Sequence, residues 1–130
     1  MSNNEIITNE LGTFTWNEFD STYEGMIESE TLGYFHLSFT TTTGNISKNQ
    51  IDSFLNIKSN WEKIKQEISG SLGNGLTMQK CKLGAIIIPD ENNSEQPIEI
   101  AFNCKKNLFS RRHIVCAIYK NWKLEEIFYL

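Results

Sequence analysis

The chain has 130 residues, of which 39% are hydrophobic and 22% charged, with a formal net charge of −4. This composition is typical of a folded globular domain and excludes wholesale disorder. The longest apolar run, AIIIP, is far shorter than the roughly 20 residues that cross a bilayer, and the opening MSNNEIITNELG lacks the basic and apolar regions of a signal peptide. We therefore predict a single domain over residues 1–130, with a flexible tail at 1–8, a cytoplasmic location and no membrane association.

The charge is divided unevenly along the chain. Residues 1–47 contain seven acidic residues and no Lys or Arg, whereas residues 48–130 contain nine acidic and twelve basic residues, so the two parts carry −7 and +3. These charges either balance one another across a solvated surface or form an acidic face that steers a basic partner and repels nucleic acid. We predict no nucleic-acid binding.

The first elements in chain order are strands. GTFTW (12–16) and STYEGMIE (21–28) alternate apolar and polar residues, and LGYFHLSFTTT (32–42) has the clearest alternation of the chain. In this last segment Phe35, Leu37 and Phe39 are predicted to face the core, with Tyr34, His36 and Ser38 on the other side. The three segments predict an antiparallel meander.

A long amphipathic helix is predicted next, within residues 44–70. Ser47 is a good N-cap, and Gln50 three residues later completes a capping box. Gly70 stands where a glycine commonly ends a helix. The predicted apolar stripe, with the aliphatic stem of Lys58 bridging a gap, contains Ile51, Phe54, Leu55, Trp61, Ile64 and Ile68.

The rest of the chain returns to strands after the glycine-rich connection SGSLGNGLTMQK. KLGAIIIP (82–89) and PIEIAFNC (97–104) each predict a strand, and HIVCAIYKNWKLEEIFYL (113–130) predicts two, joined by a turn at 120–122. The predicted fold class is α+β: an antiparallel sheet of about six to seven strands with one main amphipathic helix packed on one face, in the order βββαββββ.

Catalytic and metal-binding signatures are missing from the sequence. The cysteines Cys81, Cys104 and Cys116 include no CxxC pair, and we predict that at least Cys104 and Cys116 are buried, reduced thiols. With only two histidines and no ligand spacing, a zinc site is not expected. His113 and Cys116 are three residues apart, so on a strand they point to opposite faces. We predict no catalytic residue, metal or cofactor, and no enzymatic activity.

Two further features are candidates for binding. The basic cluster Lys105, Lys106, Arg111 and Arg112 is either an anion-binding site or a solvated connection that balances the acidic part of the chain. Trp122 stands in a predicted turn between lysines, where an aromatic side chain is accessible to a partner.

The plan of the chain resembles that of small bacterial single-domain families found among the immunity proteins of polymorphic-toxin and contact-dependent inhibition systems. The resemblance spans Leu11 to Tyr129 and is carried by LGTFTW, an acidic YEGMIE strand, ISKNQIDSFLNIKSNWEKIKQEI and a late strand pair after RRHIV. These segments are structural and contain no catalytic motif. The resemblance implies a cytosolic protein that binds and neutralises a toxin by occlusion, without a cofactor.

Three hypotheses follow from these features. The first is a non-enzymatic, monomeric protein-binding module, an immunity protein against a basic toxin. The second is a small ligand-binding domain or enzyme with a site near the 70–76 loop and the 105–113 basic connection. The third is a structural subunit that pairs through an exposed strand edge. The partner-binding residues predicted under the first hypothesis are Asp20, Tyr23, Glu24, Glu28, Glu30, Tyr34 and His36.

Overall fold

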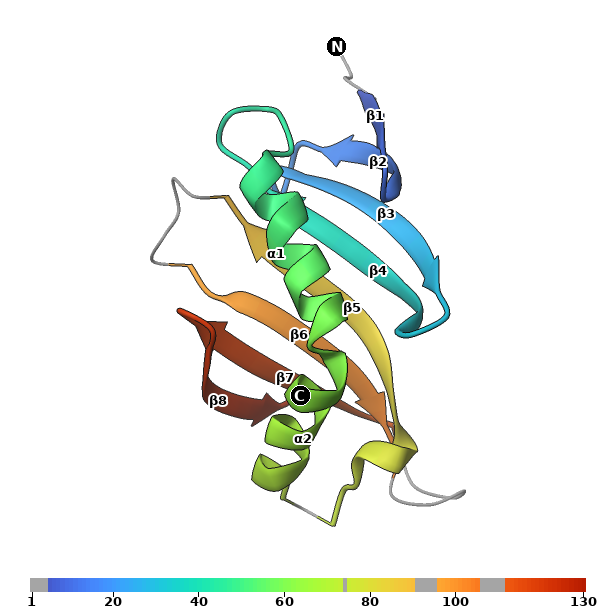
Figure 1. Ribbon diagram of the computed structural model, residues 1–130, viewed down its shortest axis with the longest axis vertical. Coiled ribbons are helices and arrows are strands. Elements are labelled where there is room, and N and C mark those ends of the chain that lie inside the picture. Colours follow the sequence, from blue (N-terminus) through green and yellow to red (C-terminus); the bar gives the residue numbers. More distant parts are fainter. Residues whose placement is uncertain (1–4, 74, 91–95, 106–111) are drawn as a thin grey trace.

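The structure is a computed structural model that describes residues 5–73, 75–90, 96–105 and 112–130 (Figure 1). Two helices lie across one face of an eight-stranded sheet whose strands follow one another in the order β1-β2-β3-β4-β5-β6-β7-β8. The elements are β1 (Ile6–Asn9), β2 (Gly12–Asn17), β3 (Thr22–Ser29), β4 (Gly33–Thr40), α1 (Lys48–Ser59), α2 (Trp61–Ser71), a 3-10 turn (Met78–Lys80), β5 (Cys81–Pro89), β6 (Ile98–Cys104), β7 (His113–Lys120) and β8 (Lys123–Tyr129).

The predicted α+β class is confirmed, but the predicted strand number and element order are not. The sheet has eight strands instead of six to seven, and two helices replace the single predicted one. All neighbouring strands pair antiparallel except β4 and β5, which run parallel with Leu37 opposite Ile86. The helices form the crossover that a parallel pair requires. The fold is therefore two antiparallel meanders, β1–β4 and β5–β8, joined at one parallel seam.

The segment predicted to be a flexible tail contains the first strand. β1 pairs with β2, with Ile6 opposite Thr15. Glu5 extends this contact, because its carbonyl accepts a hydrogen bond from Trp16 N at 2.9 Å and its carboxylate accepts one from Tyr23 Oη at 3.1 Å. The prediction of a tail is wrong for residues 5–8, and residues 1–4 lie outside the described residues. Four residues ending in Thr and Asn give too short an apolar pattern to predict a strand.

The predicted start of the helix is confirmed. Ser47 Oγ accepts a hydrogen bond from Gln50 N at 3.1 Å, and Gln50 Oε1 accepts one from Ser47 N at 3.0 Å. The helix is interrupted at Asn60, where the backbone leaves helical geometry at φ −108° and ψ 21°. Asn56 O there accepts hydrogen bonds from both the backbone N and the side-chain amide of Asn60, at 3.1 Å and 2.9 Å. It then continues past Gly70 to Ser71.

The buried helical stripe differs from the predicted one. It consists of Phe54, Ile57, Trp61, Ile64 and Ile68, spaced three and four residues apart. Ile57 is fully buried where the stem of Lys58 was expected, and Leu55 is exposed. This stripe packs on the aromatic residues of the sheet, with Phe54 stacked on Phe35 and Trp61 on Phe102, both at 6.0 Å between ring centroids.

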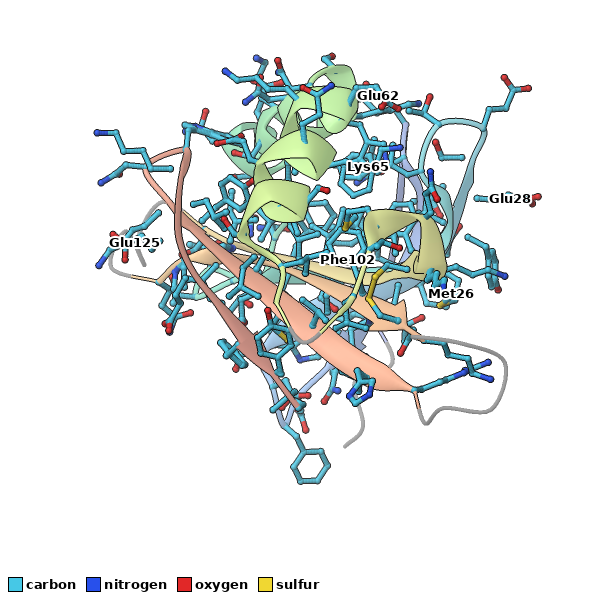
Figure 2. The ribbon with its side chains drawn as sticks, turned by 90° about the horizontal axis from the view of Figure 1, so that it is seen from below. Met26, Glu28, Glu62, Lys65, Phe102 and Glu125 are labelled. Carbon is cyan, nitrogen blue, oxygen red and sulfur yellow. A yellow bond between two sulfur atoms is a disulfide. The ribbon has the colours of Figure 1, made fainter. Side chains whose placement is uncertain are left out.

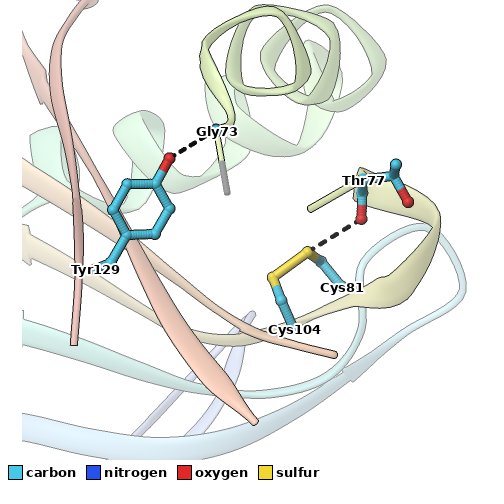
Figure 3. The surroundings of a disulfide bond; sticks show 5 residues. All are labelled: Gly73, Thr77, Cys81, Cys104 and Tyr129. Atoms are coloured by element: carbon cyan, nitrogen blue, oxygen red, sulfur yellow. Dashed lines mark hydrogen bonds between the residues drawn. A yellow bond between two sulfur atoms is a disulfide. The ribbon is translucent and has the colours of Figure 1, made fainter. Parts of the chain in front are cut away.

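Cys81 and Cys104 form a disulfide between directly opposite positions of β5 and β6 (Figure 3). The prediction of a reduced Cys104 is therefore wrong, because strand pairing brings together two cysteines that the sequence separates by 23 positions. Cys116 is a free, buried cysteine, as predicted. None of the described helices is long and apolar enough to cross a membrane.

Candidate functional site: the open face of the sheet

The sheet has one face covered by the helices and one face that no described helix covers, which we call the open face. Figure 2 shows Glu62 and Lys65 on the helical layer and Phe102 between that layer and the sheet, with Met26 and Glu28 beside the sheet. Because side chains alternate along each strand, the residues next to the inward Tyr23, Gly25 and Ile27 of β3 point to the open face.

Strand pairing aligns open-face residues of six strands, β3 to β8, into two rows. The central row is apolar except for one histidine, and half of the residues of the second row are glutamates. The central row is Met26, His36, Ala85, Ala101, Cys116 and Phe128. The second row is Glu24, Ser38, Ile87, Glu99, Ile118 and Glu126. The open face thus has an apolar centre with carboxylates along one side.

Polar contacts fix the position of Glu24 at the β3 end of the second row. Its Oε1 accepts hydrogen bonds from Thr22 Oγ1 at 3.1 Å and from Asn17 Nδ2 at 3.3 Å. The same Asn17 amide donates to Asp20 Oδ2 at 3.2 Å. Asp20 and Glu24, which were both predicted as partner-binding residues, therefore lie in one polar network and present two negative charges together.

His36 stands between Glu24 and Ser38, a combination also found in hydrolases. His36 Nδ1 lies 3.3 Å from Ser38 Oγ, and His36 Nε2 lies 4.0 Å from Glu24 Oε2. The distance between His36 and Glu24 is too long for a hydrogen bond. Ser38 is buried, with only 4% of its surface exposed. A nucleophile needs access to substrate and a short contact to its base. We interpret the trio as a polar network, which sequence analysis had missed because it depends on Glu24 pairing with Ser38 across strands.

The other predicted partner-binding residues divide between the two sides of the sheet. Glu28 and Tyr34 are cross-strand neighbours on the open face, and both are exposed. Glu30 is exposed in the turn between β3 and β4 and lines a cavity on the helical side with Trp61.

Tyr23 was wrongly predicted as a partner-binding residue. It is 1% exposed, packs against Trp16 with 4.9 Å between ring centroids, and donates to Gly44 O at 2.9 Å. Burial, reinforced by the hydrogen bond to Glu5, raises the pKa of Tyr23 above its usual value. The inward-facing position of Tyr23 on β3 places it among the core residues, so no partner reaches it.

Cys116 is the fifth of the six residues of the central row, between Ala101 and Phe128. Its side chain is 8% exposed although it lies on the face that no described helix covers. Burial raises the pKa of the Cys116 thiol, and the negative charge of Glu99 raises it further. A thiol in this state is a poor nucleophile, which fits a packing role within the central row.

Part of the predicted basic cluster lines a pocket at one end of the open face. Lys105 and Arg112 line a cavity of about 430 Å³ together with Lys80 and Lys82. We call these four residues the basic pocket. Lys106 and Arg111 lie outside the described residues. The loop at 70–76 contributes none of the described lining residues, since Gly73 instead donates its N–H to Tyr129 Oη at 2.8 Å (Figure 3).

Trp122 lies far along β7 from the basic pocket, in the predicted turn. Asn121 and Trp122 have φ of 51° and 62°, the left-handed pair of a tight hairpin turn. A bulky residue is disfavoured in that conformation, and the Trp122 side chain is 48% exposed. It lines two hollows on the helical side, so it does not share a surface with the central row.

Within the described residues, no group of three or more His, Cys, Asp or Glu side chains is placed to hold a metal ion. No family model, curated protein or solved structure matches the chain.

Proposed function

We propose that the protein is a non-enzymatic protein-binding module whose open face docks onto a basic partner. The observation that supports this proposal is the apolar central row, with Met26 49% exposed, flanked by Glu24, Glu99 and Glu126. Apolar contacts at the centre of an interface supply affinity, and surrounding charges speed association and select the partner. The partner class we propose is a basic toxin domain, neutralised by occlusion, as the resemblance to immunity proteins implies.

Charge reversal on the open face tests the proposal. We expect Glu28→Lys combined with Glu126→Lys to slow association with a toxin domain encoded beside this protein by about tenfold or more at low salt, and to weaken protection of cells. Glu62→Lys combined with Glu67→Lys makes the same change in net charge on exposed positions of α2. Stopped-flow association rates of both variants, measured over a range of salt concentrations, separate a local effect from a net-charge effect.

The control decides which face is used. If the helix variant loses association as strongly as the open-face variant, only net charge matters and the assignment of the open face is wrong. Unchanged association and protection in the open-face variant would contradict the proposal altogether. A third change, Met26→Asp, tests the apolar centre and is expected to speed dissociation, because it places a charge in the interface.

The cytoplasmic location is part of the proposal, and the Cys81–Cys104 disulfide weighs against it. Disulfides persist in oxidising compartments and are rare in the cytosol. Acid quenching of intact cells, followed by alkylation of free thiols in denaturant and mass measurement of the protein, distinguishes the two cases. Three alkylated cysteines would support a cytoplasmic location, and one alkylated cysteine would contradict it.

A further inference from the structure

Four cationic side chains converge in the basic pocket. They come from three neighbouring parts of the sheet: Lys80 and Lys82 flank the start of β5, Lys105 follows β6, and Arg112 precedes β7. The side chains of Asn103 and Tyr34 also line the cavity, and the described lining residues include no Asp or Glu. Every polar side chain in this lining is therefore able to donate a hydrogen bond.

The backbone holds these cations close together. Lys105 N donates to Lys80 O at 3.1 Å, directly beside the Cys81–Cys104 disulfide. One residue further along β5, Lys82 pairs with Asn103. Like charges on adjacent strands repel and destabilise a sheet, and the disulfide opposes their separation. An anion bound between them would remove this repulsion.

A β-bulge shapes the floor of the pocket. The register between β5 and β6 shifts between Leu83 and Ala85, which makes Gly84 the extra residue. A Cβ atom at Gly84 would lie 2.8 Å from Asn103 Nδ2, so the glycine allows the Asn103 amide to lie across the bulge. Bulges redirect side chains beside binding sites, and a strand glycine often marks the close approach of a ligand.

We propose that the basic pocket binds a compact anion with two or more linked phosphate groups. Several cations within about 430 Å³ exceed what one phosphate needs, and Arg and Lys side chains with amide donors are the groups that bind phosphate oxygens. Glu24 and Glu28 on β3 of the same face repel a long nucleic-acid backbone. Met26, which is changed in the test of the apolar centre, also lines this cavity. The charge variants that test the two proposals share no residue, so their outcomes are distinguishable.

Titration calorimetry with tripolyphosphate tests the site on the intact, disulfide-bonded protein. We expect one bound tripolyphosphate per chain, with affinity falling as salt rises. Lys82→Gln combined with Arg112→Gln is expected to weaken binding about tenfold or more, since hydrogen bonds between charged groups are the strong ones. The control, Lys63→Gln combined with Lys123→Gln, removes two positive charges from exposed positions on α2 and β8 and is expected to bind normally.

A second variant keeps every charge in place. Gly84→Ala is expected to displace the Asn103 amide and to weaken binding by about threefold, an effect on the scale of one neutral hydrogen bond. Equal losses in the pocket variant and the control would show attraction by net charge alone and overturn the site. No saturable binding to the native protein would also overturn it. Tighter binding of a single-stranded dodecanucleotide than of tripolyphosphate would overturn the assignment of a compact ligand.

Discussion

Gln50 connects the first turn of α1 to the ends of both parallel strands. It is 1% exposed, and its Nε2 donates to Thr40 O at 2.8 Å and to Ile88 O at 3.0 Å. Its Oε1 accepts from Ser47 N at 3.0 Å. Gln50→Met keeps the length of the side chain and removes all three hydrogen bonds. At about 1 kcal/mol for each bond, we expect a loss of about 3 kcal/mol in the free energy of unfolding.

Urea unfolding followed by circular dichroism measures this loss. Gln66→Met, at an exposed position of α2, is the matched control and is expected to change the free energy by less than about 0.5 kcal/mol. Gln50→Glu keeps the acceptor but places a carboxylate against two carbonyl oxygens. We expect it to be more destabilising at about pH 7 than at about pH 4, where the carboxyl is protonated and able to donate. A loss below about 1 kcal/mol in Gln50→Met would refute this account of the seam.

Three further predictions concern buried side chains. Tyr119→Phe removes a buried hydroxyl that has no hydrogen-bond partner among the described residues, and it is expected to raise the free energy of unfolding by about 1 kcal/mol; a comparable decrease of that free energy, measured by urea unfolding, would contradict this. The Cys81–Cys104 disulfide joins residues 23 positions apart, and its reduction is expected to lower the free energy of unfolding by about 3 kcal/mol. The double serine variant, insensitive to reductant, is the control. Cys116, whose pKa is raised by burial, is expected to react with a disulfide reagent about 100-fold more slowly in the native protein than in urea; equal rates would show that the open face is more accessible than described.

Strand periodicity predicted the two faces of the sheet well. In β4, Phe35, Leu37 and Phe39 are buried on the helical side and His36 faces the other way, as the alternation predicts. Such a pattern depends only on neighbouring residues, so it is present in the sequence. The buried face of the helix was harder to predict, because Leu55 and Ile57 belong to two overlapping sets of apolar residues at helical spacing. Only packing against the sheet decides that Ile57 is buried.

The features that could not be predicted from the sequence depend on which strands pair with one another. The disulfide needs β5 paired with β6 at Cys81 and Cys104. The basic pocket likewise needs Lys82 brought to Arg112 across β6. Local charge along the chain pointed to the basic connection at 105–113 but not to Lys80 and Lys82 at the start of β5. Tyr23 was misassigned although its inward position on β3 was readable, because its hydroxyl and neighbouring acids suggested a surface role.

The single parallel seam has a consequence for the order of folding. Every other strand pairs with its neighbour along the chain, so each four-stranded meander is built from local contacts that close quickly. Among the described strand pairs, the seam alone joins distant parts of the chain, such as Leu37 and Ile86, and it must wait for the helices to fold back across the sheet. We therefore expect two structured halves to form first and the central pair of strands to close last. Destabilising changes at the seam, unlike those within a meander, would then speed unfolding and leave the early steps of folding unchanged.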